Sequence, residues 1–228
     1  MSFKNYLKEE AGKERQKLSQ MSGRDKVWYI WEYYKLPIIG AVIVVFLIAS
    51  FAHAFYSNRF DNALYIMILN DKSGGDNHTD EMADALGEYL NLGKNERVVI
   101  DDSLSATYGD STTEMGYASL AKITALITTK DLDVIISDKA SMDHFGSLNA
   151  YSNLEEELPA DLYALVKDHL YYADNSDGVS YPCAIRLDES RFPEESGAIL
   201  KPPYLAILTN SQHKEACFAL IRYLFEQA

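Results

Sequence analysis

The stretch from Leu36 to Asn58 reads LPIIGAVIVVFLIASFAHAFYSN and has no charged residue between its flanks, Lys35 and Arg59. A helix of about 20 such residues rises about 30 Å, which is the thickness of the hydrocarbon core of a bilayer. A core helix of a globular domain would normally be shorter or carry a polar face. Residues 36–58 are therefore predicted to form a transmembrane helix whose partner is the lipid bilayer.

Aromatic residues and an asymmetry of charge accompany this stretch. Rings that settle at the headgroup level of a membrane stand directly before it, namely Trp28, Tyr29, Trp31, Tyr33 and Tyr34. Residues 1–35 hold eight Lys and Arg against five Asp and Glu, a net charge of +3, whereas the rest of the chain has a net charge of −16. Because the positive flank of a span stays in the cytoplasm, we expect a single-pass protein of the cell membrane. Its N-terminus would be cytoplasmic and its C-terminal domain extracellular.

A second interpretation treats the apolar stretch as a cleaved secretory signal. Ala52-His53-Ala54 has small residues at A-x-A spacing, which would permit cleavage after Ala54. A leader of 35 residues and an apolar stretch of nearly full membrane length favour an uncleaved anchor instead. The expected organisation is a cytoplasmic tail with a juxtamembrane aromatic helix (1–35), a transmembrane helix (36–58) and an extracytoplasmic α/β domain (59–228).

Net charge and cysteine content limit the possible partners. The excess of negative charge beyond residue 35 opposes nucleic-acid binding, because a phosphate backbone is bound by clustered Lys and Arg. It would also repel an anionic membrane surface. The two cysteines, Cys183 and Cys217, are too few for a disulfide framework. One bridge between them stays open as an alternative, although two buried thiols are the favoured interpretation.

Strand-length apolar runs alternate with helical patterns in the first half of the outer domain. Strands are expected over 63–69, 97–100 and 132–136. Helices are expected after an N-cap at Thr79 and after a capping box at Ser111–Glu114. Such βαβαβ alternation predicts an α/β fold with a mainly parallel sheet covered by helices.

The second half of the outer domain has a different pattern. The turn cluster Asn175–Gly178 separates two short apolar runs and predicts a hairpin added to the sheet. An apolar run over 204–208 precedes a last helix, for which Ser211 is the expected N-cap. Near the N-terminus, Ser22 followed by Asp25 resembles a capping box that opens a helix toward the membrane.

Polar residues follow the three predicted parallel strands, where ligands of open α/β sheets bind. Four carboxylates converging there would attract a cation or an amine-bearing ligand, although short polar residues also finish turns and cap helices. We predict no metal and no cofactor, and the candidate ligand-binding residues are Asn70, Asp71, Asp101, Asp102, Ser137 and Asp138.

Motifs of known catalytic chemistry are absent from the sequence. It has no G-x-S-x-G, H-E-x-x-H, P-loop or G-x-G-x-x-G pattern, and its five histidines lack metal-ligand spacing. We therefore expect no enzymatic activity. A hydrolytic reading stays open only because surface carboxylates are plentiful.

Two passages resemble bacterial extracellular solute-binding proteins of the type 2 periplasmic-binding fold. The first is KDLDVIISD (130–138) with FGSLNAY (145–151) and LEEEL (154–158). The second is YLAILTNS (204–211) leading into KEACFALIRYL (214–224). About 170 residues make one domain, so the resemblance implies a membrane-anchored, degenerate relative that corresponds to one lobe.

This resemblance implies a binding or interaction module whose partner is a small ligand or a membrane protein. The alternative is an accessory subunit of a membrane transport or secretion assembly that has no small ligand of its own.

Overall fold

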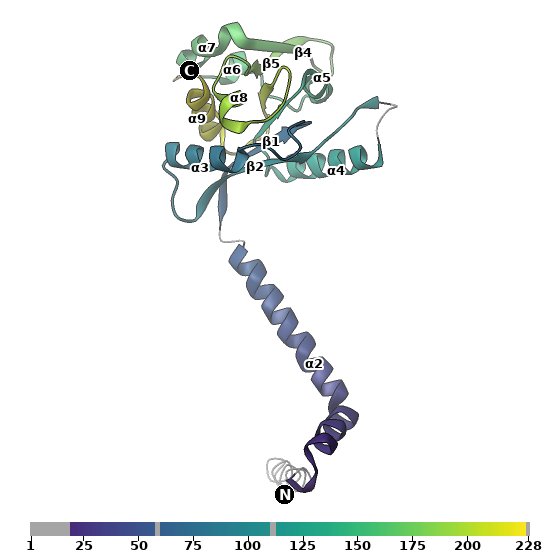
Figure 1. The fold of residues 1–228 in the computed structure, drawn as a ribbon. Helices are drawn as coiled ribbons and strands as arrows, with labels where there is room; N and C mark the ends of the chain where they lie inside the picture. The colour runs from purple at the N-terminus through teal and green to yellow at the C-terminus, as the bar shows by residue number, and fades with distance from the viewer. Residues whose placement is uncertain (1–18, 58–59, 110–112, 227–228) are drawn as a thin grey trace, which may run out of the picture. The chain divides into compact units, whose positions relative to one another are not determined.

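The computed structural model describes residues 19–57, 60–109 and 113–226 (Figure 1). The chain divides into two compact units, Met1–Arg59 and Phe60–Ala228.

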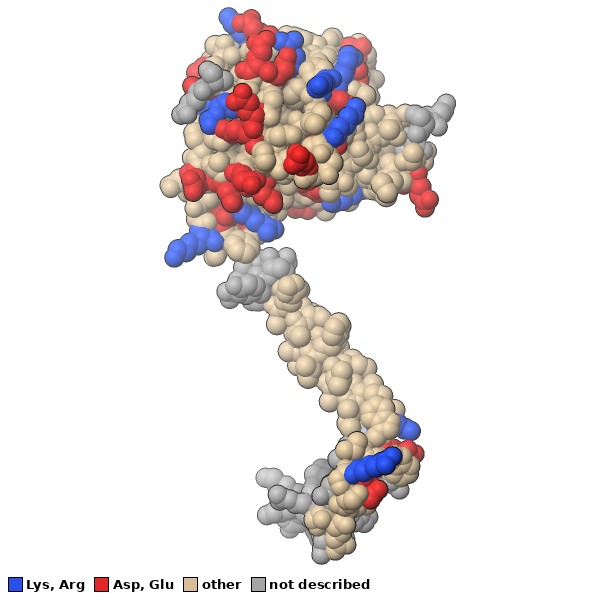
Figure 2. Space-filling model, viewed as in Figure 1, with Lys and Arg blue, Asp and Glu red and all other residues tan. Residues whose placement is uncertain are grey.

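The first unit contains one long helix, α2 (Gly23–Ser57). It begins where the capping pattern predicts, because the Asp25 backbone N–H donates to Ser22 Oγ at 3.4 Å and the Ser22 hydroxyl donates to the Asp25 carboxylate at 2.7 Å. Its segment Lys35–His53 has a mean hydropathy of 2.4 and is long and apolar enough to cross a membrane. Figure 2 shows this segment without charge beyond its first turn. The position after Ala54, where the alternative interpretation places signal cleavage, lies within this continuous helix.

The second unit is built on one sheet of six strands. In chain order they are β1 (Asp61–Leu69), β2 (Glu96–Leu104), β3 (Val134–Ser137), β4 (Leu170–Asp174), β5 (Ser180–Arg186) and β6 (Tyr204–Ile207). The order across the sheet is β2-β1-β3-β6-β5-β4. The fold is therefore α/β, as predicted.

The expectation of a mainly parallel sheet is wrong. Strand β1 pairs in parallel with β2 and β3, but the pairings β3–β6, β5–β6 and β4–β5 are antiparallel. The predicted hairpin is present as β4 and β5, and β6 joins it to the parallel half, so the sheet is mixed. Hydrophobic periodicity marks where strands lie and carries no information on their direction, which explains the error.

Helices cover both faces of the sheet (Figure 1). They are α3 (Thr79–Tyr89), α4 (Glu114–Thr129), α5 (Lys139–Ser147), α6 (Leu154–Glu157), α7 (Ala160–Val166), α8 (Phe192–Ser196) and α9 (Lys214–Phe225), with a 3₁₀ turn at Lys167–His169. The core has two parts that follow the alternation along β1: Leu64, Ile66 and Ile68 pack with α3 and α9, whereas Met67 and Leu69 pack with α4 and α5. Both parts use residues of the second unit only, so this unit has a complete core of its own.

Three predicted helix caps are wrong by one or two residues. Thr79 is the first helical residue and His78 is the N-cap, because the Thr79 hydroxyl bonds the Asp102 carboxylate instead. The N-cap of α4 is Thr113, whose side chain accepts from the Gly116 N–H, while Ser111 and Thr112 lie outside the described residues. The N-cap of α9 is His213, because the Ser211 hydroxyl donates to Asp133.

The two cysteines are free and buried. Cys217 packs on the α9 side of the sheet and Cys183 on the α5 side, so they belong to different parts of the core. Burial raises the pKa of each thiol to about 12. Both side chains therefore act as small core hydrophobes, in agreement with the favoured interpretation.

Candidate functional site

The carboxyl ends of β1 and β3 are neighbours in the sheet, with Ile68 paired to Ile136. Asn70 follows β1, Ser137 ends β3 and Asp138 is the N-cap of α5. The structure brings these three predicted residues together at one edge of the sheet. Sequence separation between the two loops is 68 residues, so the fold alone creates the cluster.

Asn70 connects the two loops. Its side-chain amide donates to Asp138 Oδ2 at 3.1 Å, and its Oδ1 accepts from the Ala106 backbone N–H at 2.8 Å. Asn70 has φ +67°, a left-handed conformation that Asn tolerates better than most residues. The other Asp138 oxygen, Oδ1, accepts from the backbone N–H and the hydroxyl of Ser141 at 3.0 and 2.9 Å. Both loops are thereby held in one conformation.

Ser137 and Tyr108 belong to the same hydrogen-bond network, because both contact the Ser141 hydroxyl. The fully buried Ser137 hydroxyl donates to the Leu69 carbonyl oxygen at 2.9 Å and lies 2.8 Å from Ser141 Oγ. The Tyr108 hydroxyl donates to Ser141 Oγ at 2.9 Å. Burial raises the pKa of Tyr108 to about 12, so this phenol stays protonated. Ser137 is therefore a support of the site and is not exposed to a ligand.

Asp71 and Asp102 form a second network, joined by the side-chain amide of Asn77. Asn77 Nδ2 donates to Asp71 Oδ2 at 3.0 Å and to Asp102 Oδ2 at 2.5 Å. Asp71 Oδ1 accepts from the backbone N–H groups of Ser73 and Ile199 at 3.0 and 2.7 Å. Burial raises the pKa of Asp71, but these hydrogen bonds outweigh it and leave the pKa below its usual value. These two carboxylates therefore fix the loop after β1.

Asp101 faces away from the other predicted residues. It lies within β2, which extends to Leu104 and not only to Ile100 as predicted, so its side chain and that of Asp102 point to opposite faces. Its carboxylate accepts from the Lys122 ammonium at 2.8 Å and from the Tyr65 hydroxyl at 3.1 Å. The four carboxylates were expected to converge on one rim, the edge of the sheet where β1 and β3 end. This expectation is wrong, because Asp101 points away from Asp71, Asp102 and Asp138.

The observed arrangement does not favour a bound cation. Within residues 19–57, 60–109 and 113–226, no group of three or more His, Cys, Asp or Glu side chains is placed to hold a metal ion. The carboxylates of Asp71, Asp102 and Asp138 already accept hydrogen bonds from amide and hydroxyl groups. An amine-bearing ligand would have to compete with these donors.

Two adjoining hollows border the Asn70–Asp138 contact. One has a volume of about 460 Å³ and is lined by Ala106, Thr107 and Tyr108 as well as Ser105 and Ala140. The other has a volume of about 400 Å³ and is lined by Ile199, Leu200 and Lys201. Asn70, Lys72 and Asp138 line both. Volumes of this size are typical of sites for small ligands.

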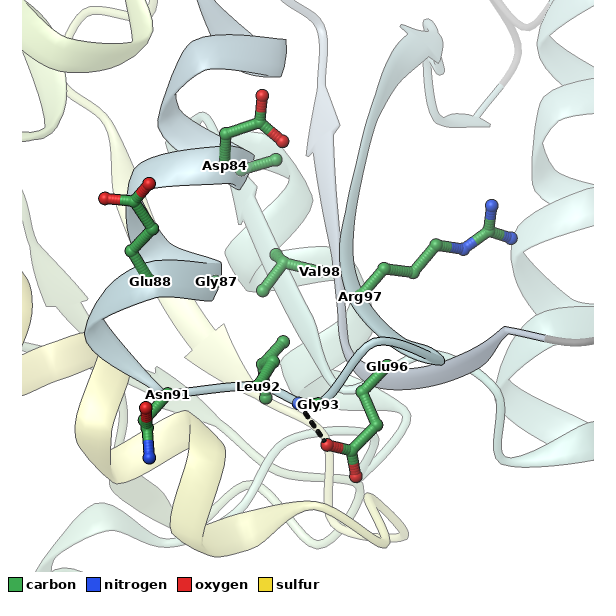
Figure 3. A pocket seen from close by; sticks show the side chains of 10 residues that line it. Asp84, Gly87, Glu88, Asn91, Leu92, Gly93, Glu96, Arg97 and Val98 are labelled. Atoms are coloured by element: carbon green, nitrogen blue, oxygen red, sulfur yellow. Dashed lines mark hydrogen bonds between the residues drawn. The ribbon is translucent and has the colours of Figure 1, made fainter.

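A larger hollow of about 530 Å³ lies at the start of β2 and the end of α3, far along the strands from the rim (Figure 3). Its titratable side chains do not converge: Asp84, Glu88 and Arg97 point away from one another in the figure. The Glu96 carboxylate is used locally and accepts from the Gly93 N–H at 2.8 Å. This hollow offers no focused set of polar groups to a ligand.

One Asp–His pair lies at the other end of the strands, where Asp133 directly precedes β3. Asp133 is fully buried and accepts from His213 Nδ1 at 3.1 Å. The Ser211 hydroxyl donates to the same carboxylate at 2.6 Å and not to the imidazole. A nucleophilic serine needs its proton accepted by the histidine, so these three residues do not form a catalytic triad.

Several residues at the rim were missed by sequence reasoning. Ser141 stands three positions after Asp138, a spacing typical of a side-chain cap, and this signal was available. Tyr108 and Lys201 reach the rim from other segments, Asn77 lies in the loop after β1, and nothing local in the sequence marks any of them.

Comparison of the chain with known protein families, with curated proteins and with solved structures found no match.

Proposed function

We propose that the chain is a membrane-anchored binding module that captures a small ligand in the two hollows beside the Asn70–Asp138 contact, the rim hollows. The observation that carries this proposal is the sharing of Asn70, Lys72 and Asp138 by two adjoining hollows whose walls are held by hydrogen bonds from separate segments. A site of fixed geometry loses less conformational entropy on binding than a mobile one.

Helix α2 supports the anchor in this proposal. Its segment Lys35–His53 has the length and apolar character of a span, and the positive charge of residues 1–35 favours a cytoplasmic N-terminus. The sheet domain would then stand outside the cell. The resemblance to one lobe of a solute-binding protein supports the same role, in which the domain binds its ligand and does not transform it.

A binding experiment with matched variants tests the proposal. Full-length protein in detergent is titrated calorimetrically with a panel of sugars, amino acids, peptides and small anions. We expect one class to bind and the variants Asn70→Gly and Asp138→Ala to lose that binding. Asn153→Ala is the control, because it removes the side-chain cap of α6 away from the rim. Equal binding by all variants would exclude the rim as the site.

A second candidate function is favoured by the outer side of α4. This side carries few charges, Glu114 and Lys122 among them (Figure 2): Met115 and Tyr117 are 77% and 63% exposed, and Ala118, Ala121 and Ala125 are exposed beside them. Uncharged surface with exposed aromatic and Met side chains is typical of protein contacts. It supports an accessory subunit that docks on a membrane protein through α4.

Co-purification from membranes of the source cells separates the two functions. An accessory subunit should lose its partner when Ala121→Glu introduces a charge on α4, while Ala164→Glu on the exposed side of α7 should have no effect. Retention of every partner by the Ala121→Glu variant would count against docking through α4.

A further inference from the structure

We infer that the ligand of the rim hollows carries an anionic group, a carboxylate or a phosphate, held between the ammonium groups of Lys72 and Lys201. This inference rests on the proposed function and names the chemical class of its ligand. It follows from three observations on the smaller hollow.

The first observation is the local sign of charge. The chain beyond residue 35 has a net charge of −16, yet the hollow of about 400 Å³ is lined by two lysines and one acid. Lys122, Lys139 and Lys214 form ion pairs, Lys122 with Asp101 at 2.8 Å. Within the part of the chain that the structure describes, neither Lys72 nor Lys201 has a carboxylate within ion-pair distance. Their charge is available to a ligand.

The second observation concerns the acid that shares the hollow. Both oxygens of Asp138 are engaged, Oδ1 by the N–H and hydroxyl of Ser141 and Oδ2 by the amide of Asn70. Asp138 also stands at the N-terminus of α5, where the helix dipole favours a negative charge. Among the described residues its carboxylate forms no ion pair with Lys72 or Lys201, and two positive charges against one negative charge leave the lining of the hollow net positive.

The third observation is that the two lysines are held on one hollow although 129 positions separate them. The Lys72 backbone N–H donates to the Ile199 carbonyl oxygen at 3.3 Å, and the Ile199 N–H donates to Asp71 Oδ1 at 2.7 Å. These paired contacts fasten the loop after β1 to the segment that carries Lys201. Two ammonium groups on fastened segments can bind one anion together.

The other hollow indicates the rest of the ligand. Its lining beyond the shared residues is uncharged and includes Ala106, Thr107 and Tyr108. A ligand that fills both hollows would place its anionic group beside Lys201 and an uncharged part beside Tyr108. A lysine ammonium is a point charge that accepts carboxylate and phosphate alike, so the two anions have to be distinguished by experiment.

Calorimetric titration of the full-length protein in detergent, at constant ionic strength, tests this inference. The probes are succinate, inorganic phosphate, neutral succinamide and cationic 1,4-diaminobutane. We expect an anion to bind and the neutral and cationic probes to fail. Each of Lys72→Gln and Lys201→Gln should weaken the anion by about ten-fold, the loss expected for one charge-assisted hydrogen bond. Lys94→Gln is the matched control, because Lys94 is exposed and lies in the loop before β2 at the other end of the sheet.

The outcomes separate the inference from the function on which it rests. Binding of succinamide or 1,4-diaminobutane without binding of either anion would overturn the anionic class and keep the binding function. Anion binding that Lys72→Gln and Lys201→Gln leave unchanged, or that Lys94→Gln weakens equally, would also overturn the inference. Silence of all four probes would contradict it, and silence across the wider panel as well would contradict the proposed function.

Discussion

The side-chain amide of Asn70 donates to the carboxylate of Asp138 at 3.1 Å and thereby joins the end of β1 to the first turn of α5. The same Asn70 side chain accepts from the Ala106 N–H at 2.8 Å. One residue in a left-handed conformation thus fixes three segments at the edge of the sheet. The rim hollows owe their shape to this contact.

Substitutions of Asn70 should separate the contribution of its side-chain hydrogen bonds from the cost of its left-handed backbone. Asn70→Gly removes the hydrogen bonds and keeps the positive φ, so we expect a loss of about 1–2 kcal/mol in the free energy of unfolding. Asn70→Ala adds the cost of a left-handed backbone and should lose about 1 kcal/mol more. Urea unfolding of residues 60–228, followed by circular dichroism, measures both. Equal stability of the two variants would contradict the strained conformation.

Asp133 should be the most sensitive polar residue of the core. It is fully buried, and its carboxylate accepts from the Tyr65 N–H, the Ser211 hydroxyl and His213 Nδ1. Asp133→Ala leaves these donors without their acceptor and should reduce the free energy of unfolding by about 3 kcal/mol or more. Ser211→Ala removes one donor only and should cost about 1 kcal/mol. A smaller loss for Asp133→Ala than for Ser211→Ala in urea unfolding would refute this ranking.

The Asp101–Lys122 ion pair should make stability depend on acid pH. Burial raises the pKa of Asp101, but hydrogen bonds from Lys122 and Ser103 outweigh it and leave the pKa at about 2, below the ordinary value of 3.8. A lowered pKa stabilises the fold fully above the unfolded value, and this contribution disappears as the pH falls from 3.8 toward 2.

The variant Asp101→Asn checks this dependence. We expect it to lose about 1 kcal/mol at neutral pH, because Lys122 is half exposed and solvent screens the pair. The difference from wild type should shrink toward pH 2 when urea unfolding is repeated across the acid range. A difference that stays constant with pH would show that the effect is not electrostatic.

The two thiols should be inert in the folded protein. Burial raises the pKa of Cys183 and of Cys217 to about 12, so neither forms a thiolate near neutral pH. A thiol reagent such as Ellman's reagent should detect no thiol in the native protein and both after unfolding in urea. Detection of no thiol after unfolding under non-reducing conditions would instead indicate a disulfide.

Sequence reasoning located the three strands of the parallel half, because each contains an apolar run, although β2 extends four residues beyond its predicted end. It failed at positions where long-range contacts determine the end of a strand or the cap of a helix. Asp101 and Asp102 follow an apolar run and therefore look like loop residues, but pairing with β1 extends β2 through both and turns their side chains to opposite faces. Thr79 and Ser211 have good capping side chains, yet both hydroxyls bond buried or distant carboxylates instead.

The candidate site was predictable only in part. Asn70 and Asp138 stand where parallel strands end, so a general rule of α/β sheets locates them. Lys201 reaches the same hollow through contacts between the Asp71 loop and Ile199, which join residues 128 positions apart. No periodicity or motif encodes such a long-range contact, so it required the structure.

We propose that residues 36–58 span the membrane and hold the domain beyond Arg59 outside the cell. Proteinase K added to intact cells that produce the chain with an N-terminal tag tests it most directly. We predict loss of the full-length chain and survival of a short tagged fragment that contains α2 and sediments with the membranes. A tagged chain that stays intact until the cells are lysed, or that appears in the soluble fraction without detergent, would contradict the account.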